Sequence, residues 1–192
     1  VFIAKDGYQL LAADYSQIEL RVLAHLSQDE VLTDAFLKKE DIHTRTASEV
    51  FGIDPLFQTS ELRRRAKTIN FGIIYGQTAF GLAKELQISN QEAQNFISRY
   101  FETYVGVKTF IDQTISKTQK RQSTRTLFGR HRQIPDINSH NKNLRHFAQR
   151  TAVNSPIQGT AADLIKLAMI QIHHKLKKQH LESKMLLQVH DE

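Results

Sequence analysis

Hydrophobic positions recur at helical spacing through the first part of the chain. Apolar side chains three to four residues apart predict helices over 16–27, 29–38 and 41–51. Pro55 interrupts this pattern, and a further helix is predicted over 60–76. The first half of the chain is therefore expected to be mainly helical.

The helical pattern continues in two later stretches. Ser89 stands three residues before Glu92, which is the spacing of a capping box and predicts a helix start. The apolar residues that follow form one stripe, which we interpret as core and not as a cofactor site: Ala93, Phe96, Ile97, Tyr100, Phe101 and Tyr104. A last helix is predicted to resume after Gly159 and to end among the lysines near 178.

Strand patterns lie mainly at the two ends. Residues 2–4 and 8–13 flank an Asp6-Gly7 turn signal and predict a β-hairpin, and 185–189 predicts a strand. Residues 125–130 resemble a strand and turn, followed by a polar connection over 135–143. The order favours an α+β fold, with one sheet assembled from distant segments around an inserted helical lobe.

Composition narrows the possible classes. The 192 residues are 40% apolar, enough for a core, and they contain neither a membrane-spanning run nor a signal-peptide pattern, so we expect a cytoplasmic protein. Because cysteine is absent, a metal must bind carboxylates, carbonyls or histidines. The chain begins with Val1 and stops shortly after an apolar run that we interpret as an unfinished strand, so we expect a fragment.

Positive charge is concentrated in one segment. The net charge is +6, but residues 115–150 contain one acid, Asp136. Clustered cations favour phosphate backbones through counterion release, so the segment indicates a nucleic-acid partner. The basic residues are Lys117, Lys120, Arg121, Arg125, Arg130, Arg132, Lys142, Arg145 and Arg150.

Two carboxylates follow the apolar runs at the chain ends. Asp14 comes after the first run and Asp191 after the last. If these strands are neighbours, the two side chains meet at the sheet rim and can hold two cations roughly 3.5–4 Å apart. The alternative is that Asp14 caps the helix beginning near Ser16 and that residues 191–192 form a turn.

The predicted helix over 61–76 carries a second candidate constellation. Arg63, Lys67, Phe71 and Tyr75 are spaced four residues apart and form a slanting stripe in which two cations precede two aromatic rings. Its length is comparable to a nucleotide, and its cations lie toward the phosphate-favouring N-terminal end. The alternative is an amphipathic helix whose rings pack inward while its cations are solvated.

Three motifs in order resemble those of bacterial DNA polymerase I-type (family A) enzymes. The first is Asp14-Tyr15-Ser16-Gln17-Ile18-Glu19-Leu20-Arg21, the second runs from Arg63 to Gly76, and the third is Gln188-Val189-His190-Asp191-Glu192. Segments 41–44, 126–130 and 154–163 also look like that family, so the resemblance covers essentially the whole chain. Arg65, Val105 and His131 depart from the usual pattern, away from any proposed catalytic group.

The resemblance implies a metal-dependent active site. Asp14 and Asp191 are expected to hold two Mg²⁺ ions with the Tyr15 carbonyl, and Glu192 is expected to assist nearby. Lys67 is the expected proton donor to pyrophosphate. Primer–template DNA and deoxynucleoside triphosphates are the implied partners, and the enzyme is expected to be a monomer.

The resemblance also implies binding roles for residues beyond the metal site. Arg63, Lys67 and His43 are expected to grip the triphosphate, while Glu19 is the expected steric gate against a 2′-hydroxyl. The nucleotide-binding set is Gln17, Glu19, His43, Arg63, Lys67, Phe71 and Tyr75. The set expected to hold the minor groove, where acceptors are nearly independent of sequence, is Arg150, Asn154, Gln158 and His190.

The family fold implies a discontinuous antiparallel palm sheet with an inserted helical fingers subdomain. Residues 1–26 and 139–192 are expected to form parts of the palm, and 27–138 the fingers. The thumb and a later palm strand are expected to lie outside this chain, so weak binding or inactivity of the isolated fragment is one expected outcome. Two other functions stay open: a single-subunit RNA polymerase, and a catalytically silent nucleic-acid-binding module.

Overall fold

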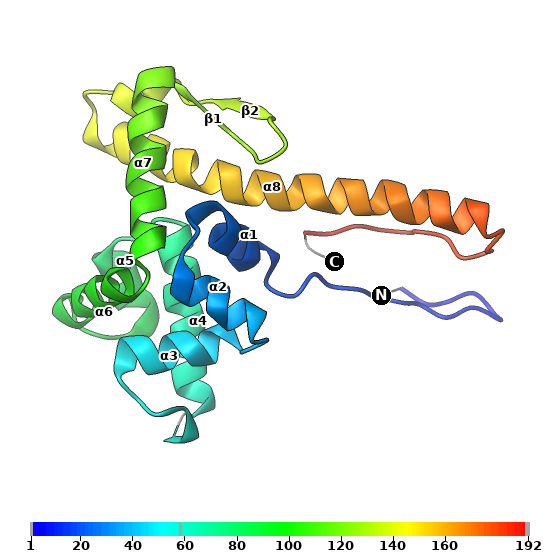
Figure 1. Ribbon diagram of the computed structural model, residues 1–192, viewed down its shortest axis with the longest axis horizontal. Coiled ribbons are helices and arrows are strands. Elements are labelled where there is room, and N and C mark those ends of the chain that lie inside the picture. The colour runs from blue at the N-terminus through cyan, green and yellow to red at the C-terminus, as the bar shows by residue number, and fades with distance from the viewer. Residues whose placement is uncertain (1, 58, 191–192) are drawn as a thin grey trace.

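The computed structural model describes residues 2–57 and 59–190, and these are mostly helical (Figure 1). The α-helices are α1 (Ile18–Ser27), α2 (Glu30–Leu37), α3 (Ile42–Phe51), α4 (Ser60–Ile74), α5 (Ala79–Leu86), α6 (Asn90–Thr103), α7 (Val105–Arg121) and α8 (Lys142–Lys178). Short 3₁₀ turns cover Pro55–Phe57 and Pro135–Asn138. Strands β1 (Ser123–Arg125) and β2 (His131–Gln133) form an antiparallel hairpin.

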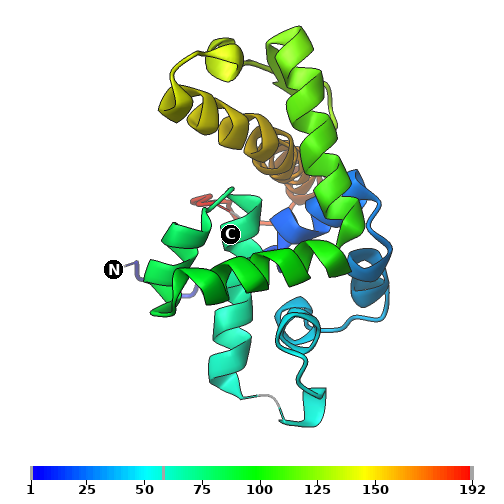
Figure 2. The ribbon, with the colours of Figure 1, turned by 90° about the vertical axis from the view of Figure 1, so that its left-hand side faces the viewer.

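The helices form a compact group beside one long helix. Helices α1 to α6 cluster together, and α7 rises from this group (Figures 1 and 2). Helix α8 crosses α7, passes beside the β1–β2 hairpin and extends far beyond the group (Figure 1). Helix α8 packs on α1 and α7, while α3 packs on α4 and α6. Among the described helices, none is long and apolar enough to span a membrane.

Six of the eight described α-helices are capped at their start by the side chain of their own N-cap residue, and α1 and α7 are not. Ser89 accepts a hydrogen bond from the backbone N–H of Glu92 at 3.1 Å, so the predicted start of α6 is confirmed. Caps of this kind satisfy N–H groups that have no partner inside the helix. The other side chains that cap helix starts in the same way are Asp29, Asp41, Thr59, Thr78 and Asn141.

The predicted stripe on α6 faces the core. Tyr100 and Tyr104 are fully buried and their rings lie 4.6 Å apart, while Ala93 is also buried. On α4 the buried residues are Ile69, Ile73 and Ile74, not the aromatic pair of the candidate stripe. Core packing of α4 therefore relies on these isoleucines, and the Arg63–Tyr75 stripe is available for binding.

The sequence interpretation of α8 was wrong about its start. The helix begins at Lys142, eighteen residues before the predicted start at residue 160, and it passes through Pro156 without a break. Proline lacks an N–H and removes one helical hydrogen bond. Buried contacts of Ala152, Pro156 and Ile157 compensate, and the Ser155 hydroxyl donates to the carbonyl of Thr151 one turn earlier. Helices α5 and α7 were not predicted.

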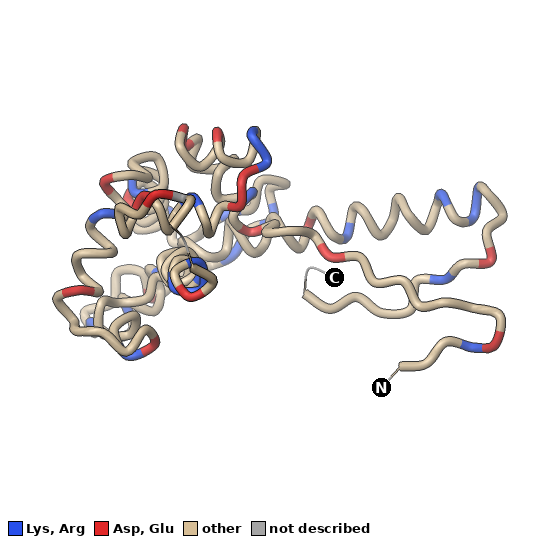
Figure 3. The backbone as a smooth tube through the Cα atoms, turned by 90° about the horizontal axis from the view of Figure 1, so that it is seen from below, with Lys and Arg blue, Asp and Glu red and all other residues tan. Residues whose placement is uncertain are grey.

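The predicted strands at the chain ends are not present as strands in the described residues. The turn at Asp6-Gly7 forms, with the Tyr8 N–H donating to the Lys5 carbonyl at 2.9 Å, but the flanking residues lie extended and exposed. A lone pair of strands is marginal in water because it has no sheet to pack in. Both terminal segments nevertheless run along the same part of α8 (Figures 1 and 3). The Tyr8 hydroxyl donates to Glu182 Oε2 at 3.4 Å.

Candidate nucleotide-binding cleft

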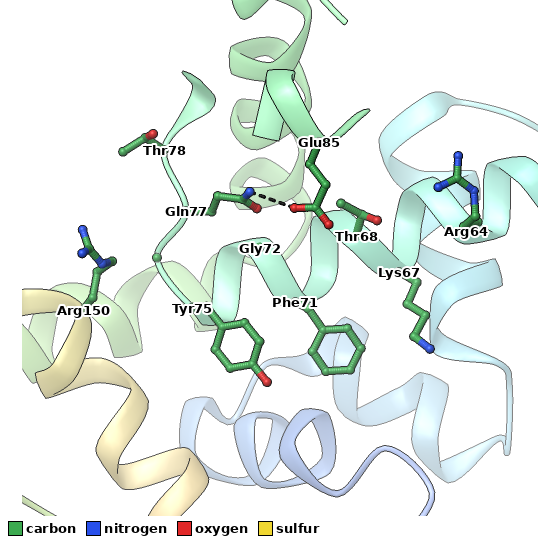
Figure 4. A pocket seen from close by; sticks show the side chains of 11 residues that line it. Arg64, Lys67, Thr68, Phe71, Gly72, Tyr75, Gln77, Thr78, Glu85 and Arg150 are labelled. Carbon is green, nitrogen blue, oxygen red and sulfur yellow. Dashed lines mark hydrogen bonds between the residues drawn. The ribbon is translucent and has the colours of Figure 1, made fainter. Parts of the chain in front are cut away.

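Helix α4 forms one wall of an open cleft of about 640 Å³. Lys67, Phe71 and Tyr75 project from the same side of the helix toward α1 (Figure 4). Arg150 reaches the cleft from α8. Residues of α4, of the turn after it and of α5 complete the lining: Arg64, Thr68, Gly72, Gly76, Gln77, Thr78 and Glu85.

The aromatic half of the stripe connects α4 to α1. The rings of Phe71 and Tyr75 stack with centroids 6.0 Å apart and planes inclined by 20°. The Tyr75 hydroxyl donates a hydrogen bond to Glu19 Oε2 at 2.9 Å. Glu19 is half-buried in the first turn of α1, so this bond fixes a carboxylate at the aromatic end of the stripe.

The cationic half of the stripe contains one paired and one unpaired side chain. Arg63 donates from Nε and Nη2 to the two carboxylate oxygens of Asp41, at 3.1 and 2.6 Å. Partial burial alone would raise the pKa of Asp41, but hydrogen bonds from Arg63 and Thr44 lower this pKa to about 2. Lys67 is exposed, and no described residue binds its ammonium group.

His43 lies beside the stripe but is almost covered. Its side chain is 2% exposed, and its ring centroid is 5.9 Å from that of Phe71. Burial, together with the positive charges of Arg63 and Lys67 and against the opposing effect of Asp41, lowers the pKa of His43 to about 4. The imidazole is therefore neutral at pH 7. Little of the His43 surface is therefore open to a ligand.

A buried polar chain behind His43 was missed by sequence reasoning. The Asn70 amide donates to His43 Nδ1 at 3.1 Å, and Thr46 lies between Asn70 and Tyr104 at 3.1 and 3.0 Å. All three supporting residues have no exposed surface. The only sequence signal was an asparagine within an otherwise apolar stretch of α4.

The residues expected to bind metal lie on or near the N-terminal segment and at the C-terminus. Asp14 and Tyr15 are exposed just before α1, and Gln17 is the N-cap of α1 with a left-handed φ of 56°. Asp191 and Glu192 lie outside the described residues, so their predicted convergence with Asp14 stays a prediction. Within the described ranges, no group of three potential metal ligands occurs.

Three of the four residues expected to contact DNA follow one another along α8. Arg150 packs over the Phe147 ring at 5.8 Å, and its side chain also lies against Gly76. Asn154 Oδ1 is buried, and no described residue donates a hydrogen bond to it. Gln158 is exposed one turn further on. His190 is exposed on the C-terminal segment, with a left-handed φ of 55°.

The fold and the cleft together are those of a helical lobe that presents cations and aromatic rings beside a long helix. The whole chain, residues 1–192, matches DNA polymerase family A. The chain therefore belongs to DNA polymerase family A.

Individual relatives are similar over nearly the whole chain. DNA polymerase I of Caldicellulosiruptor bescii is 53% identical over 192 residues, and that of Pseudomonas aeruginosa 49% identical over 191. The chain spans 23% and 21% of their lengths. Among solved structures, the POL domain of Pol1 from M. smegmatis, in complex with DNA primer-template and dNTP, has a TM-score of 0.89 and 44% identity. That match covers 93% of this chain and 31% of that one.

Proposed function

We propose that this chain forms the fingers and part of the palm of a DNA-templated DNA polymerase, which adds deoxynucleoside triphosphates to a primer 3′-hydroxyl. The observation that carries the proposal is the stripe on α4. Its Lys67, Phe71 and Tyr75 line a cleft, and it ends at the Tyr75–Glu19 hydrogen bond. The similar Pol1 structure with primer-template and dNTP supports the same substrates. We infer a monomeric intracellular enzyme.

The proposed division follows the order of the elements. Residues 27–138, which contain α2 to α7 and the hairpin, form the fingers. Residues 1–26 and 139–192 belong to the palm, whose antiparallel sheet includes the two terminal segments. The Tyr8–Glu182 contact and the shared course of both segments beside α8 support this assignment. Pairing with further strands of the full-length protein then supplies the missing sheet partners.

The stripe suits a nucleotide that lies along α4 from its phosphates to its base. Arg63 and Lys67 bind the triphosphate, with His43 beside them. Phe71 packs on the sugar, and Tyr75 shapes the base pocket. Asp41 occupies Nε and one hydrogen of Nη2 of Arg63, so the guanidinium keeps donors for a phosphate oxygen. Lys67 holds the proton that pyrophosphate takes up as it leaves.

The sugar end of the cleft provides a basis for selecting deoxynucleotides. Glu19 is held by the Tyr75 hydroxyl at 2.9 Å, so its side chain cannot move aside without breaking that bond. A carboxylate fixed against the sugar excludes a 2′-hydroxyl. Gln17, at the N-cap of α1, completes the proposed nucleotide-binding set.

The residues available for metal binding fit magnesium. Asp14 is exposed and no described residue pairs with its carboxylate, and the Tyr15 carbonyl adds a second oxygen donor. Asp191 is proposed to complete the site, with Glu192 nearby. Bound magnesium stabilises the negative charge that develops during phosphoryl transfer and favours the attacking form of the primer hydroxyl. Arg63 and Lys67 orient the triphosphate for in-line attack.

The exposed and unpaired polar groups of α8 suit the primer–template minor groove. Arg150 and Gln158 lie on the helix two turns apart, with Asn154 between them. The unpaired Asn154 Oδ1 marks a buried polar atom that a ligand or a rotation of the amide can satisfy. His190 is proposed to contribute from the C-terminal segment.

The test is metal-dependent primer extension by the full-length protein, with deoxynucleotides and ribonucleotides compared. We expect extension with deoxynucleotides, and we expect Glu19→Ala to raise relative ribonucleotide use by roughly tenfold or more. Tyr75→Phe removes the bond that holds Glu19 and is expected to give a smaller increase. Ready ribonucleotide use by the wild type would favour an RNA polymerase. Absence of extension would favour a nucleic-acid-binding module.

A further inference from the structure

Behind the cleft, a chain of polar side chains crosses the hydrophobic core of the helical group. Tyr104, Thr46 and Asn70 are completely buried, and they connect the α6–α7 junction to His43. Buried polar groups are costly unless every hydrogen bond is made. An apolar set of similar volume would pack the same space, so this chain of hydrogen bonds needs a reason beyond packing.

The chemistry of these groups determines which one donates in each hydrogen bond from Tyr104 to His43. Burial raises the pKa of Tyr104 to about 12, so its hydroxyl stays protonated and can donate to Thr46 Oγ1. The Thr46 hydroxyl then donates to Asn70 Oδ1 at 3.1 Å, and its oxygen also accepts from the Asn70 amide nitrogen at 3.0 Å. The Asn70 amide nitrogen can only donate, so His43 Nδ1 must accept.

A neutral imidazole that accepts at Nδ1 carries its proton at Nε2. Within the described ranges, no residue accepts a hydrogen bond from His43 Nε2. His43 Nε2 is also not one of the described side-chain atoms that are both fully buried and without a hydrogen-bond partner. The charged groups that face the ring are Asp41, before α3, and the α4 cations Arg63 and Lys67. The free N–H thus lies near two cations, of which Arg63 is paired with Asp41 and Lys67 is exposed.

We propose that Asn70, held by Thr46 and Tyr104, is a positioning residue that fixes His43 in the Nε2–H tautomer, so that the ring offers one N–H donor to a nucleotide phosphate oxygen. The nucleotide part rests on the proposed function, whereas the tautomer does not. The fixed tautomer matters because the other one would turn the lone pair of Nε2 toward the phosphate. The ring would then repel the ligand.

The tautomer is tested in the ligand-free full-length protein labelled with ¹⁵N-histidine. The signals of His43 are assigned by their loss in His43→Gln. We expect the Nε2–H form alone between pH 6 and 9. Asn70→Asp replaces the donor by an acceptor of equal size and is expected to shift the proton to Nδ1 and to raise the pKa of His43. Asn95→Asp, the same change on the exposed face of α6, is expected to alter neither property. A wild-type ring protonated at Nδ1, or an equal mixture, overturns the proposal.

The consequence for binding is tested by the pH dependence of nucleotide KM. In Asn70→Asp, neutral His43 loses its donor, so we expect KM to rise about tenfold at pH 9 with kcat nearly unchanged. The increase should shrink toward pH 6 as the imidazolium restores a donor. In a His43→Ala background, Asn70→Asp should have no further effect. An equal effect in both backgrounds overturns the positioning role. If the wild-type protein incorporates no nucleotide, the proposed function is wrong. The ¹⁵N measurement then still tests whether Asn70 fixes the His43 tautomer.

Discussion

Replacing one buried carboxylate, Asp29, is expected to loosen two helices at once. Its Oδ1 accepts from the Leu32 N–H of α2 at 2.9 Å. Its Oδ2 accepts from Gly106 and Val107 at the start of α7, at 2.8 and 3.2 Å. The side chain is 2% exposed, so water cannot easily replace it. Helix α7 has no side-chain cap of its own, and Asp29 supplies one from 77 residues away.

The cost of Asp29→Ala follows from these three bonds. Loss of an N-cap costs about 1 kcal/mol. Each buried N–H left without a partner costs about 1–3 kcal/mol. The total is about 4 kcal/mol, a large part of the stability of a typical domain. Close contact supports the same picture, because a Cβ at Gly106 would lie 2.7 Å from the Asp29 Cα.

Hydrogen exchange in the full-length protein measures this loss locally. In Asp29→Ala, peptides that cover the start of α7 should exchange roughly 100-fold faster, and those that cover the start of α2 about 5-fold faster. The matched control is Ser89→Ala, which removes an exposed cap with one hydrogen bond and should cost about 1 kcal/mol in α6 only. The shared cap is contradicted if Asp29→Ala lowers stability no more than Ser89→Ala does. It is also contradicted if the start of α7 keeps its protection from hydrogen exchange in Asp29→Ala.

Three further predictions concern the pH dependence of stability, a steric clash at Gly76 and a proline at the start of α7. Because the pKa of His43 is about 4 in the folded chain against an ordinary 6.5, the unfolded chain takes up the proton first as pH falls. Stability should fall by roughly 3 kcal/mol between pH 6.5 and 4, and denaturant unfolding of His43→Gln should show a shallower pH dependence. Gly76→Ala should weaken primer–template binding, measured by fluorescence anisotropy, because its Cβ would lie 2.7 Å from Arg150 Cγ. Gly52→Ala has a similar left-handed φ of 68° but open space around it, so it should leave binding unchanged. Val105→Pro, at the first position of α7, should stabilise the fold by about 0.4–1 kcal/mol, and an unchanged or lower unfolding midpoint would contradict this.

The helices that the sequence predicted are those whose signals are local. The apolar period of α6 and the Ser89 cap both lie within one stretch, and both are confirmed. The start of α8 was missed because its first turns are polar, and the apolar helical period was recognised only after Gly159. Strands at the chain ends were predicted from short apolar runs and a turn signal. Strand formation depends on partners that are distant in sequence, and in the described residues these segments belong to no sheet.

The candidate site shows the same limit. Four-residue spacing predicted the shared face of Lys67, Phe71 and Tyr75, because helix geometry fixes it. The contacts that hold the site join residues far apart in the chain. Tyr75 and Glu19 are separated by 56 residues, and Asn70 and His43 by 27. Local patterns carry no information about such pairs, so the supporting residues could not be predicted.

The central claim is that Asp14 and Asp191 act as one unit at the edge of the palm. Single-turnover primer extension by the full-length protein, with Asp14→Asn, Asp191→Asn and the double variant, tests it most directly. Each single variant should be slower by roughly 1,000-fold or more, and the double variant should be little slower than either, because groups that act together do not contribute additively. A loss below tenfold in either single variant, or losses that multiply in the double variant, would contradict the shared site.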